Sequence, residues 1–418
     1  MRDEPTGAYS RRAWFLYERL TGRRLDLPDV RAGSYVDALD PELQFVADRR
    51  RSPRHRVYDN LLGGPGMCLT VRRTMRLREQ QAAGIEEEAR RLVARYDTLT
   101  LARAVNNLFS KETRSSFAIE GEKPPSGRVE RFARSLRDAP RFDLTSKSAF
   151  LELQNQIVDP RYAATDWRRR QNFVGETIGG YREKVHFICP RPQDVPSLMQ
   201  GWMEMAERLL TSSVDPVVAA AAAAFAFVFV HPFEDGNGRI HRFLIHSILA
   251  RRGFARPDIA FPISASILRS RHLYDDALEG FSKPLFDAID WHFDADHELV
   301  VQNDTADLYR FFDATALAEY LYDRVAETVR HDLAEELGFI AIYDRALAGV
   351  LDVVDMPDRR ASLFVQVCMQ NGGKLSRGKR AQFAELDDDE IRRMEEALQE
   401  AMRAEREAHP APPGAGES

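Results

Sequence analysis

A long apolar run constrains the fold of this 418-residue chain more than any other stretch. Residues 217–230 are all alanine, valine or phenylalanine, and they follow Asp215 and Pro216. Aspartate is a preferred N-cap and proline is favoured at the first helical position, so a helix is predicted to begin here. The run is too short to cross a bilayer, which takes about 20 apolar residues. It therefore predicts a helix buried on all sides in a globular core.

A second helix is predicted just downstream of this run. Apolar side chains recur at Ile240, Leu244 and Ile248, which gives one apolar helical face that ends near Gly253. The helix should begin close to Gly238. The two helices and the loop between them form a helix-loop-helix elbow.

The elbow has the features of an anion site. Gly236, Asn237 and Gly238 lie at the start of the second helix, where free backbone N–H groups and the positive end of the helix dipole favour an anion. Arg239 and Arg242 follow in the first turn, where the dipole slightly disfavours cations. An anion is therefore expected between these two arginines.

A helix earlier in the chain supplies a candidate for that anion. Residues 99–121 are predicted to be helical, with Gly121 as the C-terminal stop and Pro124 preventing continuation. Glu120 then lies in the last turn, where the dipole disfavours a carboxylate. Because an arginine and a carboxylate pair well, we expect Glu120 and the two arginines of the elbow to satisfy each other.

The segment from Phe173 to Pro190 differs from its helical surroundings. Extended, apolar stretches flank Gly179 and Gly180, and the second stretch contains Val185 and Phe187. This pattern predicts a β-hairpin with a glycine turn. The exposed edge of such a hairpin can bind an extended peptide by strand addition.

Composition and charge restrict the class of protein. A formal net charge of −6 argues against a surface that binds nucleic acid generally, and three widely separated cysteines indicate neither a disulfide framework nor a zinc site. The first residues lack the apolar core of a secretory signal, so we expect a cytoplasmic protein without a membrane partner. The basic loop 374–380 is the one candidate for nucleic-acid contact, in a winged-helix arrangement near the end of the chain.

The stretch from His231 to Arg242 resembles the signature of the Fic family, His-Pro-Phe-x-(Asp/Glu)-Gly-Asn-Gly-Arg-x-x-Arg. Asp235 fills the acidic position and Glu234 the variable one. Residues 116–121, which run from Ser116 to Gly121, look like the inhibitory motif (Ser/Thr)-x-x-x-Glu-(Gly/Asn) of one class of Fic proteins. The hairpin corresponds to the family's target-positioning flap.

The resemblance implies a mainly α fold: a helical core with a small β-hairpin flap, flanked by further helical regions. The predicted regions are an N-terminal helical region (1–95), a Fic domain (96–290) with its inhibitory helix (about 99–121), flap (about 173–190) and signature loop (231–242), a C-terminal helical domain (291–407) and a disordered tail (408–418).

The resemblance also implies transfer of AMP from ATP to a tyrosine, threonine or serine hydroxyl of a target protein. His231 would be the general base, and an imidazole has a suitable pKa for that role. Asp235 would hold Mg²⁺, with Glu234 as a further acidic candidate. Asn237 and the neighbouring backbone amides would form the anion hole for the α-phosphate.

The remaining signature residues would bind the nucleotide. Arg239 and Arg242 would hold the β- and γ-phosphates, Phe233 would anchor the loop, and Gly236 and Gly238 would let the backbone approach the phosphates. Glu120 would inhibit the enzyme by pairing with Arg242. The target would present an extended segment to the flap, auto-modification included, and a homodimer is left open.

Three alternatives remain at this point. Relatives that phosphorylate their targets replace the glycine at the position of Gly238 by lysine, so Gly238 favours nucleotidyl transfer, with UMP and GMP open beside AMP. Some relatives with an inhibitory glutamate remove AMP, which would make Glu120 position a water. A non-enzymatic regulator would bind nucleotide in the core and DNA through the loop 374–380.

Overall fold

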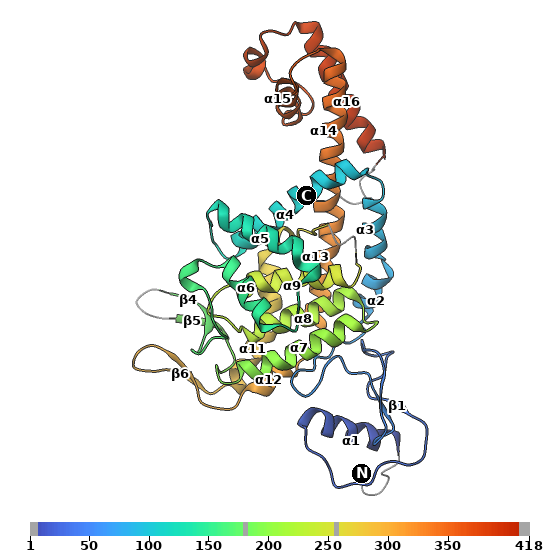
Figure 1. Cartoon of the computed structure of the whole chain (residues 1–418), viewed down its shortest axis with the longest axis vertical. Coiled ribbons are helices and arrows are strands. Elements are labelled where there is room, and N and C mark those ends of the chain that lie inside the picture. The colour runs from blue at the N-terminus through green and yellow to red at the C-terminus, as the bar shows by residue number, and fades with distance from the viewer. Residues whose placement is uncertain (1–6, 179–182, 255–258, 409–418) are drawn as a thin grey trace. The chain divides into compact units, whose positions relative to one another are not determined.

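The computed structural model describes residues 7–178, 183–254 and 259–408. The predicted glycine turn at Gly179 and Gly180 and residues 409–418 of the predicted tail lie outside these ranges. The described chain is mainly helical with a few short strands, as predicted (Figure 1). Within the described ranges, no helix combines the length and apolar character needed to cross a bilayer.

The chain divides into two compact units. The first comprises residues 1–90 and 108–330, and the second comprises residues 91–107 and 331–418. This division differs from the three predicted regions, because the N-terminal segment and residues 291–330 belong to the same unit as the helical core.

In its described residues, the first unit is built mainly from helices, with three small sheets. Its helices are α1 (Ala8–Thr21), α2 (Met75–Ala82), α5 (Ser126–Asp138), α6 (Lys147–Ile157), α7 (Val195–Thr211), α8 (Pro216–Val230), α9 (Asn237–Arg251), α10 (Ile263–Arg269), α11 (Arg271–Leu285), α12 (Ala306–Arg310) and α13 (Thr315–Glu327). The helices α3 (Ile85–Val93) and α4 (Thr98–Ile119) each cross the division between the units.

Helix α8 forms the centre of the first unit (Figure 1). Asp215 caps it, because its carboxylate accepts hydrogen bonds from the backbone N–H groups of Val217 at 2.9 Å and Val218 at 3.1 Å. Every residue from Val217 to Val230 is buried, and α7, α9 and α13 pack around the helix. The sequence prediction of a capped and fully buried helix is confirmed.

The C-terminus of α4 is closed by a glycine motif. Gly121 has a φ of +71°, the N–H of Glu122 donates to the carbonyl of Phe117 at 3.1 Å, and the N–H of Gly121 donates to Ala118 at 3.0 Å. These two bonds define a Schellman motif, which satisfies the last carbonyls of the helix. The predicted stop at Gly121 is confirmed, and the motif fixes the direction in which the next residues leave the helix.

The predicted hairpin is present. Strand β4 (Phe173–Thr177) pairs antiparallel with β5 (Glu183–Ile188), with an irregularity between Val174 and Gly175. Helix α11 packs against β5. A second short hairpin, β6 (Trp291–Phe293) and β7 (Leu299–Val301), lies where the sequence pattern predicted helix.

The N-terminal region, predicted to be helical over 1–95, also contains a three-stranded sheet that the sequence pattern did not indicate. The strands are β1 (Val36–Asp37), β2 (Arg50–Ser52) and β3 (Val57–Asp59), in the order β1-β3-β2, and α1 contacts β1 and β3. They are two or three residues long, and β2 begins with two exposed arginines. Strands this short carry no readable alternation of apolar and polar residues.

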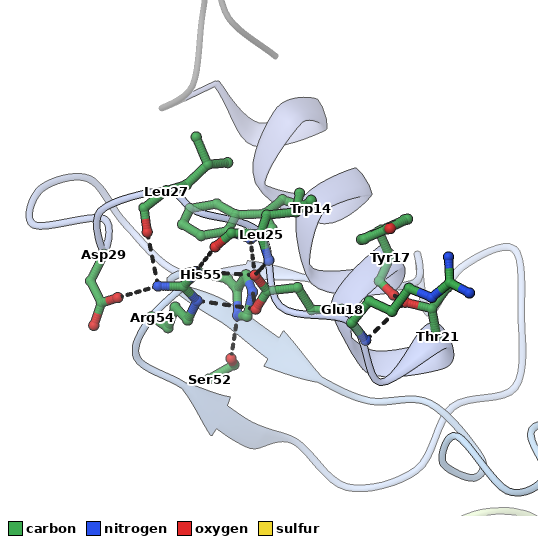
Figure 2. Close-up of polar contacts among 11 residues, drawn as sticks. Trp14, Tyr17, Glu18, Thr21, Leu25, Leu27, Asp29, Ser52, Arg54 and His55 are labelled. Carbon is green, nitrogen blue, oxygen red and sulfur yellow. Dashed lines mark hydrogen bonds and ion pairs between the residues drawn. The ribbon is translucent and has the colours of Figure 1, made fainter.

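A buried carboxylate ties α1 to this sheet. Glu18 accepts hydrogen bonds from the Trp14 indole at 2.7 Å and the Leu25 backbone at 2.8 Å, and it pairs with Arg54 at 3.0 Å and His55 at 2.9 Å (Figure 2). Burial alone would raise the pKa of Glu18, but the bonds from Arg54 and Trp14 outweigh it and lower the pKa to about 2. The carboxylate therefore stays ionised and joins three segments of the chain.

The second unit contains α14 (Ala334–Val353), α15 (Asp358–Met369) and α16 (Asp388–Ala408) around its own apolar core. No strand occurs among residues 331–408, so the predicted winged-helix arrangement, which needs a β-wing, is wrong. The basic loop runs instead into a 3₁₀-helix, Arg377–Phe383. Arg380 bonds to the carbonyls of Phe383 and Leu386 and pairs with Asp388 at 2.9 Å, so this cation serves the local fold.

Candidate active site

His231 ends α8 and begins the signature loop. Its backbone is left-handed, with φ 50° and ψ 58°, a conformation that is uncommon for a residue other than glycine. Its Nδ1 lies 3.1 Å from the carbonyl of Val228, so Nδ1–H donates and Nε2 keeps its lone pair. Burial and the nearby charge of Arg168 lower the pKa of His231 to about 4. The imidazole is therefore neutral at neutral pH and able to accept a proton.

Arg168 positions the backbone of this histidine. Its Nε donates to the carbonyl of His231 at 2.7 Å, its Nη2 donates to Pro190 at 2.6 Å, and its backbone N–H donates to Pro232 at 2.8 Å. The side chain is buried and joins the end of the flap to the signature loop. Sequence reasoning missed it, because Arg168 stands in a run of three arginines that resembles a solvated surface.

The signature loop is anchored in the core by Phe233 and Asn237. The Phe233 ring is fully buried, with its centroid 5.1 Å from that of Trp167. The Asn237 side-chain oxygen accepts from the Phe233 N–H at 3.0 Å, and its amide nitrogen donates to the Phe233 carbonyl at 2.8 Å. The predicted anchor is present. The Asn237 amide thus holds the loop backbone, and its predicted contribution to an anion hole stays a prediction.

Two glycines, Gly236 and Gly238, allow neighbouring side chains to lie close to the backbone at the start of α9. Gly236 has a φ of +95°, and a Cβ placed there would lie 3.1 Å from a methyl carbon of Val158. A Cβ on Gly238 would lie only 2.3 Å from Oε1 of Glu120. The carboxylate of Glu120 thus rests on the first turn of α9, where the sequence predicted an anion.

The predicted ion pair between Glu120 and Arg242 is present. Nη2 of Arg242 lies 2.7 Å from Oε1 of Glu120, and Arg242 also donates to the hydroxyl and to the carbonyl of Ser116, both at 2.8 Å. The Arg242 side chain is only 1% exposed. Burial would raise the pKa of Glu120, but the charge and hydrogen bond of Arg242 lower it, so the pair is ionised.

Arg239 is held by two carboxylates. Its Nη2 lies 2.5 Å from Asp235 and its Nη1 lies 2.8 Å from Glu122, and its side chain is 2% exposed. The guanidinium also lies over the Phe117 ring, 5.5 Å from the centroid. Arg239, the predicted phosphate ligand, and Asp235, the predicted magnesium ligand, thus bind each other. Glu122 was missed, because two residues beyond a helix end an acid is usually only solvated.

Asp235 is the side chain of the signature loop that offers ligands of the kind Mg²⁺ takes. Its side chain is 41% exposed and offers carboxylate oxygens, which Mg²⁺ prefers together with phosphates and water. Glu234 is exposed. Among residues 7–178, 183–254 and 259–408, no three His, Cys, Asp or Glu side chains gather as a ready metal cage.

A cavity of about 420 Å³ lies beside His231. Its walls come from the flap, from the end of α8 and from α11, and they include Gly175, Phe187 and Arg271. Of the predicted flap residues, Phe187 lines the cavity, whereas Val185 is half-buried and pairs with Gly175 in the hairpin. Sequence reasoning also missed Arg271, which donates to the carbonyl of Ile119 at the end of α4.

Comparisons with known proteins show similarity to one family over the segment that contains the signature loop. The model of the Fic/DOC family matches residues 144–249. Protein adenylyltransferase Fic of Drosophila willistoni is 34% identical over 125 residues, which cover 29% of this chain and 22% of that protein. The Drosophila melanogaster protein of the same name is 34% identical over 29% of this chain and 23% of its own length. The match thus spans less than a quarter of these curated relatives.

Two solved structures are similar to the chain. A Fic family protein from Desulfovibrio desulfuricans G20 has a TM-score of 0.43 at 18% identity, covering 82% of this chain and 98% of that one. A Fic domain containing signalling protein from Bacteroides thetaiotaomicron VPI-5482 has a TM-score of 0.44 at 18% identity, covering 61% of this chain and 96% of that one. Residues 144–249, which contain the signature loop, are thus similar to the Fic/DOC family.

Proposed function

We propose that this chain transfers AMP from ATP to a hydroxyl side chain of a target protein. The observation that carries the proposal is the anion site at the start of α9, where buried Arg239 and Arg242 flank Gly238. A helix N-terminus with two adjacent guanidinium groups suits the phosphates of a nucleotide. The curated relatives that match this segment are named protein adenylyltransferases.

The reaction follows from the placement of His231. Nε2 takes the proton of a target tyrosine, threonine or serine hydroxyl, and the oxygen attacks the α-phosphorus of ATP. The bond between the α-phosphorus and the bridging oxygen breaks, and pyrophosphate leaves. Backbone N–H groups at the start of α9 stabilise the charge on the α-phosphate oxygens. Asp235 would hold Mg²⁺, which neutralises phosphate charge when bound.

The flap is the proposed docking site for the target. Gly175 and Phe187 of the hairpin line the same cavity as His231. A target segment that extends along the flap would place a side-chain hydroxyl in this cavity. The same geometry allows a second copy of the chain to serve as target.

Glu120 is the proposed inhibitor of this reaction. Its carboxylate occupies the space over Gly238 and pairs with Arg242, which the nucleotide needs. Phosphate and carboxylate therefore compete for one site. Release of Glu120 is required before ATP binds productively.

Auto-modification of purified protein tests the proposal. With Mg²⁺ and ATP, the Glu120→Gly variant should take up label from the α-phosphate and none from the γ-phosphate, because AMP is transferred. Wild type should take up little, and Glu120→Gly combined with His231→Ala should take up none. Equal ATP affinity and equal labelling of wild type and Glu120→Gly would contradict inhibition. Labelling from the γ-phosphate would indicate phosphorylation instead.

A further inference from the structure

The end of α4 presents two carboxylates to the signature helix. Glu120 pairs with Arg242 at 2.7 Å, and Glu122 pairs with Arg239 at 2.8 Å. Both arginine side chains are almost fully buried, at 1% and 2% exposure. The two cations that the proposed function assigns to phosphate are therefore both already paired with acids from one helix end.

The backbone holds Glu122 in this place. The N–H of Glu122 donates to the carbonyl of Phe117, as the last bond of the Schellman motif. Gly121, with its φ of +71°, turns the chain so that Glu120 and Glu122 both face α9. A displacement of this helix end would withdraw both carboxylates together.

The charges around Arg239 oppose phosphate binding while Glu122 is in place. Asp235 and Glu122 each carry a negative charge and contact the one guanidinium, with Arg128 3.2 Å from Glu122 on its far side. An incoming phosphate meets an arginine whose charge is already balanced by these carboxylates. Without Glu122, Arg239 keeps Asp235 as a partner and has donors free for phosphate.

We propose that Glu122 is a second inhibitory carboxylate, which holds Arg239 as Glu120 holds Arg242. The inference rests on the proposed function, because it assigns both arginines to the phosphates of ATP. It predicts that the Glu120→Gly variant is only partly released from inhibition. It also predicts that Glu122 discriminates between nucleotides, since Arg239 is assigned to the β- and γ-phosphates, which AMP lacks.

A purely structural role for Glu122 leads to a different result. The carboxylate also bonds to Arg128, which lies over the Phe117 ring, and so it ties the helix end to α5. Loss of such a tether would lower stability and would change the affinity for ATP and AMP alike. The ratio of the two affinities therefore separates the roles.

Calorimetric titration with ATP and with AMP, each with Mg²⁺, tests the inference. All proteins carry His231→Ala to prevent transfer, and the series consists of Glu120→Gly, Glu122→Gln and the two combined. Glu130→Gln added to Glu120→Gly is the control, because Glu130 lies exposed on α5 and the charge change is identical. Adding Glu122→Gln to Glu120→Gly should tighten ATP binding about 5-fold or more and leave AMP binding nearly unchanged. Glu130→Gln should change neither.

The outcomes separate the two proposals. If ATP affinity is equal with and without Glu122→Gln, or if AMP affinity gains as much as ATP affinity, the inhibitory role of Glu122 is overturned. In that case, ATP binding to Glu120→Gly would still support the proposed function. Absence of ATP binding in every variant would overturn the proposed function and the inference with it. Circular dichroism melting of each variant confirms that the titrated protein is folded, and Glu122→Asp, which keeps the charge, should bind ATP more weakly than Glu122→Gln.

Discussion

The carboxylate of Glu120 lies against the α-carbon of Gly238. A methyl group at this glycine would meet Oε1 of Glu120 at 2.3 Å and Nη1 of Arg242 at 3.3 Å. Gly238 is in the first turn of α9, so the carboxylate sits at the positive end of the helix dipole. The carboxylate of Glu120 therefore occupies the space next to Gly238 that the proposed function assigns to the phosphates of ATP.

Substitution of Gly238 by alanine should expose this competition. Alanine favours a helix over glycine by about 0.5–1 kcal/mol, so Gly238→Ala should stabilise the Glu120→Gly protein by that amount. The same change should not stabilise wild type, because the methyl group displaces Glu120. In both backgrounds ATP binding should weaken at least about tenfold, since the phosphates lose their space. Urea unfolding and calorimetry measure the effects, and equal stabilisation of both proteins would contradict the contact.

Reversal of charge at Arg242 should damage inhibition and catalysis together. In Arg242→Glu, two carboxylates face each other at a position where the native side chain is 1% exposed, which should cost about 3–5 kcal/mol of the free energy of unfolding. The double variant Glu120→Arg with Arg242→Glu restores opposite charges and should recover part of this stability. It should not recover ATP binding, because the cation is then on the wrong helix. ATP affinity unchanged by Arg242→Glu would refute the assignment of this arginine to phosphate.

The parts of the site that follow local rules were predictable from the sequence. Asp215 and Pro216 mark the start of α8, Gly121 marks the end of α4, and dipole arguments placed Glu120 opposite the two arginines of α9. Each of these depends on residues within one or two turns of a helix. Such rules act before tertiary packing, so they can be read from the chain.

The parts that depend on tertiary contacts were not predictable. Nothing in the sequence separates Arg168, which is buried against His231, from the two arginines that follow it. The pairing of Arg239 with Glu122 depends on the direction in which the chain leaves α4 after Gly121. The division into units depends on packing between segments far apart in sequence, and residues 291–330 joined the first unit for that reason.

The pH dependence of the reaction should reflect the lowered pKa of His231. A base works when deprotonated, and burial and Arg168 lower the pKa of His231 to about 4, so kcat/KM should stay level from pH 8 down to pH 5 and fall only as the pH passes through about 4. A histidine with the ordinary pKa of about 6.5 would lose about tenfold in rate by pH 5.5. Auto-modification by Glu120→Gly at each pH, with activity after return to pH 7.5 as the control for unfolding, measures the profile. A decline centred near pH 6.5 would show that the histidine is solvated during catalysis.

The buried carboxylate of Glu18 should stabilise the N-terminal sheet in a pH-dependent way. Its pKa is about 2 in the folded protein and about 4.5 when unfolded, so its ionisation contributes stability that is fully present above pH 4.5 and is lost as the pH falls towards 2. Glu18→Gln keeps the shape but removes one of the two carboxylates that pair with Arg54, the other being Asp29, and it should lower the free energy of unfolding at pH 7 by about 1.5–3 kcal/mol. Urea unfolding followed by tryptophan fluorescence can measure this, because Trp14 bonds directly to Glu18. The difference between Glu18→Gln and wild type should shrink at pH 3, whereas exposed Glu42→Gln should show no difference at either pH. A difference that stays constant between pH 7 and pH 3 would mean that packing, and not ionisation, accounts for the contribution of Glu18.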